Sequence, residues 1–221
     1  MSRHHRQSGS IGARLNLLLG LLGVLLLVSY LIYNWVGRQD AAQARRYEQQ
    51  SAANATIPEG AAIGGAFTLT NQDGKVVTEK DFRGKMMLLT FGYTYCPDVC
   101  PTKLQDISLA LDNLGAEAQW VQPVFISVDP QRDTPTQMKQ YVELYHNRIQ
   151  GLTGTNDQVA AIAKAYKIYY KRAEDTGDGN YMMDHSTGIY LFDQEGKFLE
   201  IFGEGTDPTK IADKIKQHFH R

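Results

Sequence analysis

The sequence predicts an α/β protein, a three-layer sandwich with a mixed sheet, preceded by one transmembrane helix. One stretch of 23 residues, 15–37, carries no charged side chain. The rest of the chain alternates short apolar runs with amphipathic stretches and closes with a hairpin and a helix. That alternation is typical of strands and helices packed in layers around one core.

Composition narrows the class of protein. The chain has 221 residues, 43% of them hydrophobic and 21% charged, as in ordinary globular proteins, so a disordered or fibrous chain is excluded. Lysine and arginine number 23 against 24 acidic residues, a formal net charge of -1. Because nucleic-acid-binding proteins carry a marked basic excess, we expect no nucleic-acid partner.

Residues 15–37 are long enough to cross a membrane as a helix, at about 1.5 Å per residue against a hydrocarbon core of about 30 Å. Tyr30, Tyr33 and Trp35 gather at one end, where aromatic rings favour the headgroup region. The alternative is a cleaved signal peptide, with Ala42-Gln43-Ala44 as its cleavage site, but signal peptides have shorter apolar regions of about 7–15 residues. We therefore favour an uncleaved anchor. Three arginines lie close to each end of this segment, so the positive-inside rule does not give the orientation of the helix.

Four segments follow from this division. Residues 1–14 form a short basic N-terminus, 15–37 the anchor, 38–63 a polar spacer poor in large apolar residues, and 64–221 the soluble domain.

The first half of the soluble domain predicts a hairpin, two buried strands and a helix. Residues 67–70 and 75–78 flank an Asp-Gly turn, which is typical of a hairpin. The nearly continuous apolar runs 86–93 and 121–128 indicate strands buried on both faces. Between them, Leu104, Ile107, Leu111 and Leu114 recur at helical spacing.

The second half predicts three helices and a hairpin. Helices are expected over 136–146, over the stretch that carries Val159, Ile162, Ala163 and Tyr166, and from Asp207 to the end, where Ile211, Ile215 and Phe219 share a face. Residues 167–171 are a candidate strand, and 188–192 and 198–202 a hairpin. This order of elements is that of a thioredoxin-like fold.

The two cysteines, Cys96 and Cys100, lie between a buried strand and a helix. At that position side chains enter the crevice where α/β proteins place their sites, and a helix start stabilises thiolates. Redox pairs usually have two intervening residues, whereas three put both sulfurs one helical turn apart on one face. Two thiolates are too few for a closed zinc site but suit Cu(I), and one imidazole would complete a trigonal site.

Of the six histidines, His185 is the best third ligand. His4 and His5 precede the apolar segment, His146 is near a helix end, and His218 and His220 are at the C-terminus. His185 is expected to open a strand beside the cysteines, after a glycine-containing loop over 175–180.

Three motifs make the chain resemble the Sco/SenC family of membrane-anchored copper-binding proteins. They are residues 90–102 (TFGYTYCPDVCPT), 127–135 (SVDPQRDTP) and 184–186 (DHS). The resemblance implies a thioredoxin-like domain in which Cys96, Cys100 and His185 bind copper, as Cu(I) or Cu(II). It also implies a role in assembling the copper centre of cytochrome c oxidase. We expect a copper metallochaperone, not an enzyme.

The resemblance further implies partners and a compartment. The expected partner is the copper-centre subunit of cytochrome c oxidase, with another copper chaperone or a thiol–disulfide protein as further partners. The domain would face the periplasm or, in eukaryotes, the intermembrane space. About 14 residues before the helix leave little room for a mitochondrial presequence, so we expect a bacterial inner-membrane protein with a single span.

The main alternative is a membrane-anchored thiol:disulfide oxidoreductase, in which Cys96 attacks and Cys100 resolves. A thiol peroxidase is disfavoured because its Pro-x-x-x-Thr-x-x-Cys arrangement is absent. A structural disulfide is the remaining alternative, although closing so small a loop contributes little stability.

Several nearby residues have a structural and a functional interpretation. Asp98 is expected to cap the helix, and Asp129 and Asp133 to satisfy backbone amides of a turn, with roles in the site or in docking as the alternatives. Met182 and Met183 could offer thioethers to Cu(I), but we expect at least one of them to pack into the core.

Overall fold

The computed structural model describes residues 16, 18–35, 63–173 and 181–219. The chain divides into two units, Met1–Ala52 and Ala53–Arg221, and each is described by itself. In the first unit, one helix covers Leu18–Trp35, with a mean hydropathy of 1.9, and is long and apolar enough to cross a membrane. The expected apolar N-terminal helix is therefore present. The segments 1–14 and 38–62 lie outside the described residues.

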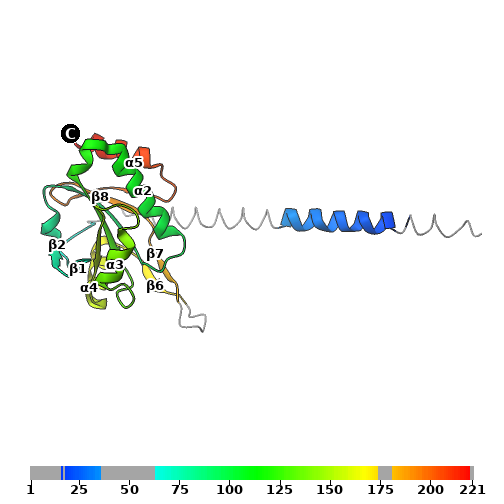
Figure 1. Ribbon diagram of the computed structural model, residues 1–221, viewed down its shortest axis with the longest axis horizontal. Helices are drawn as coiled ribbons and strands as arrows, with labels where there is room; N and C mark the ends of the chain where they lie inside the picture. Colours follow the sequence, from blue (N-terminus) through cyan, green and yellow to red (C-terminus); the bar gives the residue numbers. More distant parts are fainter. Residues whose placement is uncertain (1–15, 17, 36–62, 174–180, 220–221) are drawn as a thin grey trace, which may run out of the picture. The chain divides into compact units, whose positions relative to one another are not determined.

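A seven-stranded mixed sheet forms the centre of the second unit (Figure 1), in the order β2-β1-β5-β4-β3-β8-β9. Strand β3 pairs in parallel with β4 and antiparallel with β8, and β4 pairs in parallel with β5. The strands are β1 (Thr68–Asn71), β2 (Val76–Thr78), β3 (Met86–Gly92), β4 (Val121–Ser127), β5 (Gln150–Thr153), β8 (Ile189–Phe192) and β9 (Phe198–Phe202). Both predicted hairpins, β1–β2 and β8–β9, are confirmed.

Four α-helices accompany the sheet: α2 (Val99–Leu114), α3 (Pro135–Val142), α4 (Asn156–Tyr166) and α5 (Pro208–Phe219), with short 3-10 helices η1 (Glu79–Phe82) and η2 (Gly115–Trp120). Helix α5 begins where it was predicted, and the Asp207 carboxylate accepts the Thr209 N–H at 2.8 Å. Helix α4 begins with a capping box, in which Thr155 and Gln158 bond each other's backbone amides.

Side chains alternate across β3 and so assign the layers. Phe91 faces α4, and its ring lies 6.1 Å from that of Tyr166. Gly92 faces the opposite side, where a Cβ atom would lie 2.5 Å from Sγ of Cys100 on α2 and 2.7 Å from the ring of Phe125.

The same side of the sheet also carries α3 and α5. The ring of Tyr141 on α3 packs 5.5 Å from that of Phe125, and α5 packs along α2. Helices α2, α3 and α5 thus cover one face and α4 the other, which confirms the three-layer sandwich.

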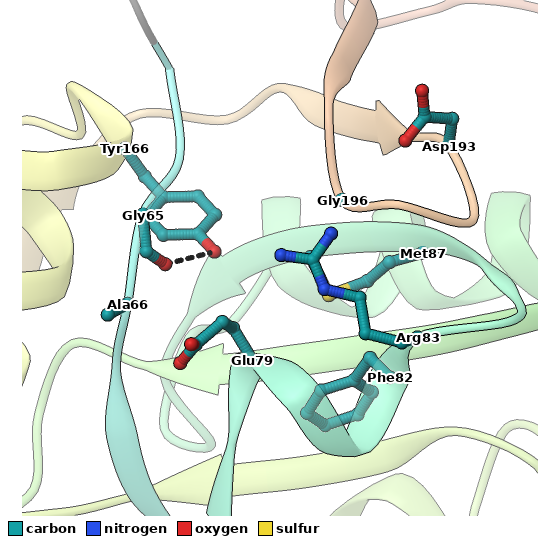
Figure 2. A pocket seen from close by; sticks show the side chains of 9 residues that line it. All are labelled: Gly65, Ala66, Glu79, Phe82, Arg83, Met87, Tyr166, Asp193 and Gly196. Atoms are coloured by element: carbon teal, nitrogen blue, oxygen red, sulfur yellow. Dashed lines mark hydrogen bonds between the residues drawn. The ribbon is translucent and has the colours of Figure 1, made fainter.

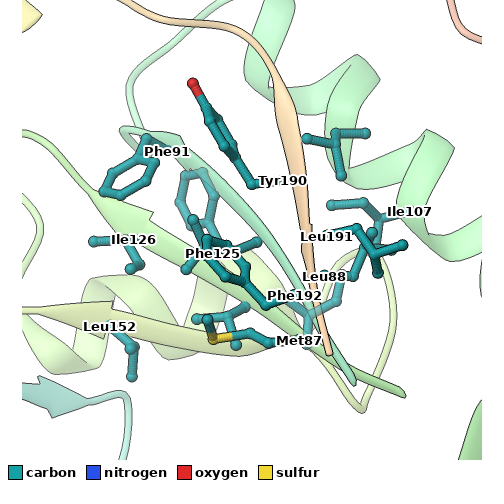
Figure 3. Close-up of a cluster of buried hydrophobic side chains, with 14 of the residues drawn as sticks. Met87, Leu88, Phe91, Ile107, Phe125, Ile126, Leu152, Tyr190, Leu191 and Phe192 are labelled. Atoms are coloured by element: carbon teal, nitrogen blue, oxygen red, sulfur yellow. The ribbon is translucent and has the colours of Figure 1, made fainter. Parts of the chain in front are cut away.

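The core lies on both sides of β3, all seven residues of which are buried. Figure 3 shows Leu88 of β3 and Leu191 of β8, paired in register, beside Ile107 of α2. The apolar run that predicted a strand buried on both faces is thereby explained, because helices cover each side.

Three elements differ from the expectation. Helix α3 ends at Val142 instead of His146, because Leu144 and Tyr145 donate to carbonyls three residues back and tighten the chain into turns. Strand β5 was not predicted; it is short and contains Gly151, over which α3 packs closely. The strand expected over 167–171 begins only at Tyr170, because Lys167 ends α4 in the left-handed conformation.

Candidate metal centre

The ligand atoms of Cys96, Cys100 and His185 lie within 4.8 Å of one another. The three residues come from the loop after β3, the first turn of α2 and the β6–β7 hairpin. Among the described residues this is the one group of three or more Cys, His, Asp or Glu side chains whose geometry could hold a metal ion. The structure therefore brings together the three side chains that the sequence indicated.

Only Cys100 belongs to the helix. Cys96 lies in the turn before α2, where its N–H donates to the Tyr93 carbonyl, so the expectation of two cysteines on one helical face is wrong. The sulfurs are close for another reason, because the loop turns over the helix start. The Cys100 N–H points at Sγ of Cys96 at 3.5 Å, so an otherwise unpaired helix amide faces that sulfur.

Asp98 occupies the N-cap position, but its carboxylate makes no capping hydrogen bond within the described part of the chain. Its carbonyl instead accepts from the N–H and the hydroxyl of Thr102. The prediction of a capping carboxylate is thus wrong, because the Asp98 backbone, with φ -142° and ψ -71°, is not in the extended conformation that N-cap residues usually adopt.

The two thiols differ in burial and in acidity. Cys100 is 2% exposed, whereas Cys96 is half-buried. A hydrogen bond from the Cys100 thiol, with the backbone of Asp98 and Cys100 adding to it, holds the pKa of Cys96 well below its usual range. The same bond and then burial raise the pKa of Cys100. The pair therefore holds one thiolate, on Cys96, and one proton, on Cys100.

His185 lies in a separate two-stranded sheet formed by β6 (Tyr170–Arg172) and β7 (Met183–His185). The sequence had suggested that His185 opens a strand, but His185 is the last residue of β7, and the next strand starts at Ile189. The reason is that β7 pairs with β6 and not with a strand of the seven-stranded sheet, and this pairing places His185 opposite Tyr170. The loop expected over 175–180 lies outside the described residues.

Three contacts orient the imidazole. Nδ1 lies 2.9 Å from the Ser186 carbonyl oxygen, which can only accept, so Nδ1 carries the proton. In the neutral imidazole the lone pair is then on Nε2, which lies 3.4 Å from Sγ of Cys100. The ring of Tyr93 packs edge-on against the imidazole, at 5.8 Å between centroids. A backbone carbonyl on the outer nitrogen is a common arrangement in metal-binding histidines.

Asp133 fastens the cysteine loop to the end of β4. Its buried carboxylate accepts the Thr94 N–H and, at 2.7 Å, the Thr94 hydroxyl, together with the Ser127 hydroxyl at 2.5 Å. The expectation that Asp133 satisfies a backbone amide is confirmed, and burial raises its pKa. Asp129 instead binds the side chains of Arg132 and Tyr181, which the sequence analysis did not single out.

The remaining candidates lie apart from the sulfurs or at their margin. Met183 packs against the core as expected, whereas Met182 is 46% exposed, and its sulfur accepts from the Tyr93 hydroxyl at 3.6 Å. His146 accepts the Arg148 N–H, and His218 lies 3.9 Å from Glu200. His4, His5 and His220 lie outside the described residues.

A separate pocket of about 140 Å³ lies at the start of β3, the opposite end from the cysteines. Figure 2 shows Arg83, Glu79 and Tyr166 around it, with Asp193 from the β8–β9 turn. It contains no thiol or imidazole, and a Gly65 carbonyl already accepts the Tyr166 hydroxyl. Among the described residues, the group of side chains that could hold a metal ion therefore lies at the other end of β3.

The sequence model of the SCO1/SenC family matches residues 55–220, nearly the whole second unit. The chain belongs to the SCO1/SenC family. Its relatives in this family include the mitochondrial SCO1 homolog 1 of Arabidopsis thaliana, 39% identical over 185 residues, and the mitochondrial SCO2 homolog of Bos taurus, 38% identical over 186 residues. These matches cover 80% and 83% of this chain, but 54% and 69% of the relatives. The chain thus spans about half the length of the Arabidopsis protein. A bacterial relative is the SCO2-like protein of Rickettsia felis.

Solved SCO1/SenC structures share the fold. Bradyrhizobium japonicum ScoI with copper bound is 46% identical with a TM-score of 0.67, and yeast Sco1 with copper bound is 38% identical with a TM-score of 0.68. The matches cover 71% and 72% of this chain and 99% and 90% of those chains. The thioredoxin-like α/β fold is thereby confirmed.

Proposed function

We propose that this SCO1/SenC protein binds one copper ion through Cys96, Cys100 and His185 and delivers it for assembly of the copper centre of cytochrome c oxidase. The observation that carries the proposal is the convergence of two sulfurs and one imidazole nitrogen within 4.8 Å. Copper-bound relatives with 46% and 38% identity support the choice of metal.

The donor set fits copper by its chemistry. Cu(I) accepts soft thiolates and a low coordination number, and two sulfurs with one nitrogen complete a trigonal set. The Cys96 thiolate and the Nε2 lone pair of His185 are ready to bind, whereas Cys100 must release its proton. Binding by this dithiol would therefore release a proton.

The three proposed ligands differ in burial, which suits the transfer of copper to a partner protein. Cys96 and His185 are half-buried and within reach of a partner's ligands, whereas Cys100 is buried beneath them. A partner can replace Cys96 and His185 first and Cys100 last. Copper would thus pass to the partner by stepwise ligand exchange and would not be released into water.

The proposed setting is the bacterial inner membrane, with one span over residues 15–37, a spacer over 38–63, and the domain 64–221 in the periplasm. The apolar helix Leu18–Trp35 supports the anchor. The proposed partner is the copper-centre subunit of cytochrome c oxidase, with another copper chaperone or a thiol–disulfide protein as further partners.

The test is a titration of the reduced full-length chain in detergent with Cu(I) under a competing chelator. Wild type should bind one equivalent, and Cys96→Ala, Cys100→Ala and His185→Ala should each bind more weakly. His218→Ala is the matched control, because that half-buried histidine lies at the far end of α5. Undiminished affinity in His185→Ala would contradict the three-ligand site.

A second candidate, thiol:disulfide exchange, is favoured by the unequal thiols. The Cys96 thiolate would attack a target disulfide, forming a mixed disulfide and releasing one target thiolate. Cys100, after losing its proton, would attack Cys96, forming the Cys96–Cys100 disulfide and releasing the second target thiol. A related Sco protein, BsSco, 26% identical with a TM-score of 0.56, is described as having a disulfide switch.

Exchange and copper binding make different demands on the site. A Cys100→Ser variant should accumulate mixed disulfides if Cys96 attacks targets, and His185→Ala should leave that exchange intact. A Cys100→Ser variant that traps no partner would count against the exchange activity.

A further inference from the structure

The hairpin that carries His185 is fastened to the domain at its two ends. At the histidine end, the Thr90 hydroxyl of β3 donates to the Gly188 carbonyl at 3.1 Å, and the Ser186 N–H donates to the Tyr169 carbonyl of the same hairpin. The other end begins at Tyr181, which directly follows the undescribed stretch 174–180. The position of His185 therefore depends on what holds Tyr181.

Tyr181 is held by the loop between β4 and α3. Its hydroxyl donates to Oδ1 of Asp129 at 2.8 Å, and Nε of Arg132 donates to the other carboxylate oxygen. Tyr181 is 8% and Asp129 3% exposed, so both are shielded from water. Hydrogen bonds to a buried carboxylate are strong and costly to remove.

The ring of Tyr181 is also stacked between two guanidinium groups. Arg132 lies 3.6 Å from its centroid and Arg172, on β6, lies 3.7 Å from it. Arginine packed on an aromatic ring is favourable, more so when partly desolvated. Arg172 of β6 is paired with Met183 of β7, so the stack holds both strands of the β6–β7 hairpin, called the histidine arm below.

Arg132 reaches the cysteine loop as well. Its guanidinium lies 4.9 Å from the ring of Tyr95 and 5.6 Å from that of Tyr93. Tyr95 immediately precedes Cys96, and Tyr93 packs on His185. One arginine therefore contacts both the segment that carries the attacking sulfur and the segment that leads to the imidazole.

We propose that Asp129, Arg132 and Tyr181 form a clasp that positions His185 against the two cysteines, and that the clasp affects copper affinity through His185. These are positioning residues, since none of them offers a ligand atom to the group of Cys96, Cys100 and His185. The inference rests on the proposed copper-binding function and assigns Asp129 a role in the site.

The test is a double-mutant cycle on the full-length chain in detergent, with Cu(I) affinity measured against a competing chelator. Tyr181→Phe removes the hydroxyl and keeps the stacked ring. It should weaken Cu(I) binding about tenfold, the low end of the range for partners that orient a metal ligand. In a His185→Ala background the same substitution should change affinity less than about twofold, because no imidazole remains to be positioned.

Tyr169→Phe is the matched control. Tyr169 lies in the same arm, is 54% exposed, and its hydroxyl has no hydrogen-bond partner in the described part of the chain. It should bind copper as wild type does. An equal loss from Tyr181→Phe with and without His185 would overturn the proposal, because the clasp would then act on the fold or on the cysteines. Undiminished affinity in Tyr181→Phe would overturn it too.

A metal-free readout separates this inference from the copper function. Hydrogen exchange of the amides of residues 183–186 should quicken in Tyr181→Phe and stay as in wild type in Tyr169→Phe. If wild type binds no copper while exchange quickens, the proposed function fails and the clasp stands. If copper binds and exchange is unchanged, the clasp fails alone.

Discussion

Nε2 of His185 lies 3.4 Å from Sγ of Cys100, although 85 positions separate the two residues. The contact joins the first turn of α2, a helix that covers the seven-stranded sheet, to the end of β7 in the separate two-stranded sheet. Neither element alone can form the site. Copper affinity should consequently depend on how firmly the β6–β7 hairpin is held against the start of α2.

Gly92 leaves room for the Cys100 sulfur, which makes it a sensitive position. A Cβ atom there would lie 2.5 Å from Sγ of Cys100 and 2.7 Å from the ring of Phe125. Gly92→Ala should lower the free energy of unfolding by about 1–3 kcal/mol through overpacking and should weaken Cu(I) binding.

Gly203→Ala is the control for Gly92→Ala, because no heavy atom of the described chain outside its immediate neighbours lies within 4 Å of its Cβ position. Urea unfolding of both variants checks the prediction. Equal stabilities of the two would show that the space beside Gly92 is not tight.

The two thiols should react at different pH values. Because the Cys100 thiol keeps Cys96 ionised, iodoacetamide should modify Cys96 below the ordinary thiol pKa and spare buried Cys100. Removing that donor in Cys100→Ala should raise the pKa of Cys96 and move its alkylation profile to higher pH.

Cys100→Ser, which keeps a hydroxyl donor, should shift the alkylation profile of Cys96 less than Cys100→Ala does. Mass spectrometry of the alkylated protein from pH 4 to pH 9 measures both profiles. Coincident profiles for wild type and Cys100→Ala would contradict the assigned hydrogen bond.

The Asp133 carboxylate should matter more for stability than a surface carboxylate. Asp133→Ala leaves the buried hydroxyl of Ser127 and the partly buried donors of Thr94 without their acceptor, which should cost about 2 kcal/mol. Asp73→Ala, which removes an exposed ion pair with Lys139, should leave the unfolding midpoint unchanged. Thermal unfolding of both variants is the measurement, and a similar small shift in each would contradict the anchoring role.

The sequence predicted those parts whose pattern is local. The apolar run of β3 and the helical spacing in α2 gave the central strand and its helix, and both hairpins followed from their turn residues. Strand β5 was missed because its four residues show no alternation. The β6–β7 sheet was missed because a long connection, residues 173–182, and not a short turn joins its two strands.

The candidate site was predictable as a set of residues but not as a geometry. Two cysteines and a process of elimination among histidines indicated Cys96, Cys100 and His185. The role of Arg132 and Tyr181 was not accessible, because it depends on stacking between segments about 50 residues apart, for which no local pattern exists.

The most direct test of the copper site is X-ray absorption at the copper edge of the Cu(I)-loaded full-length chain. The three-residue site predicts a first shell of two sulfurs and one nitrogen, with the nitrogen lost in His185→Ala and one sulfur lost in Cys100→Ala. A wild-type shell of sulfur alone, or a shell that is the same in wild type and His185→Ala, would contradict the proposed site.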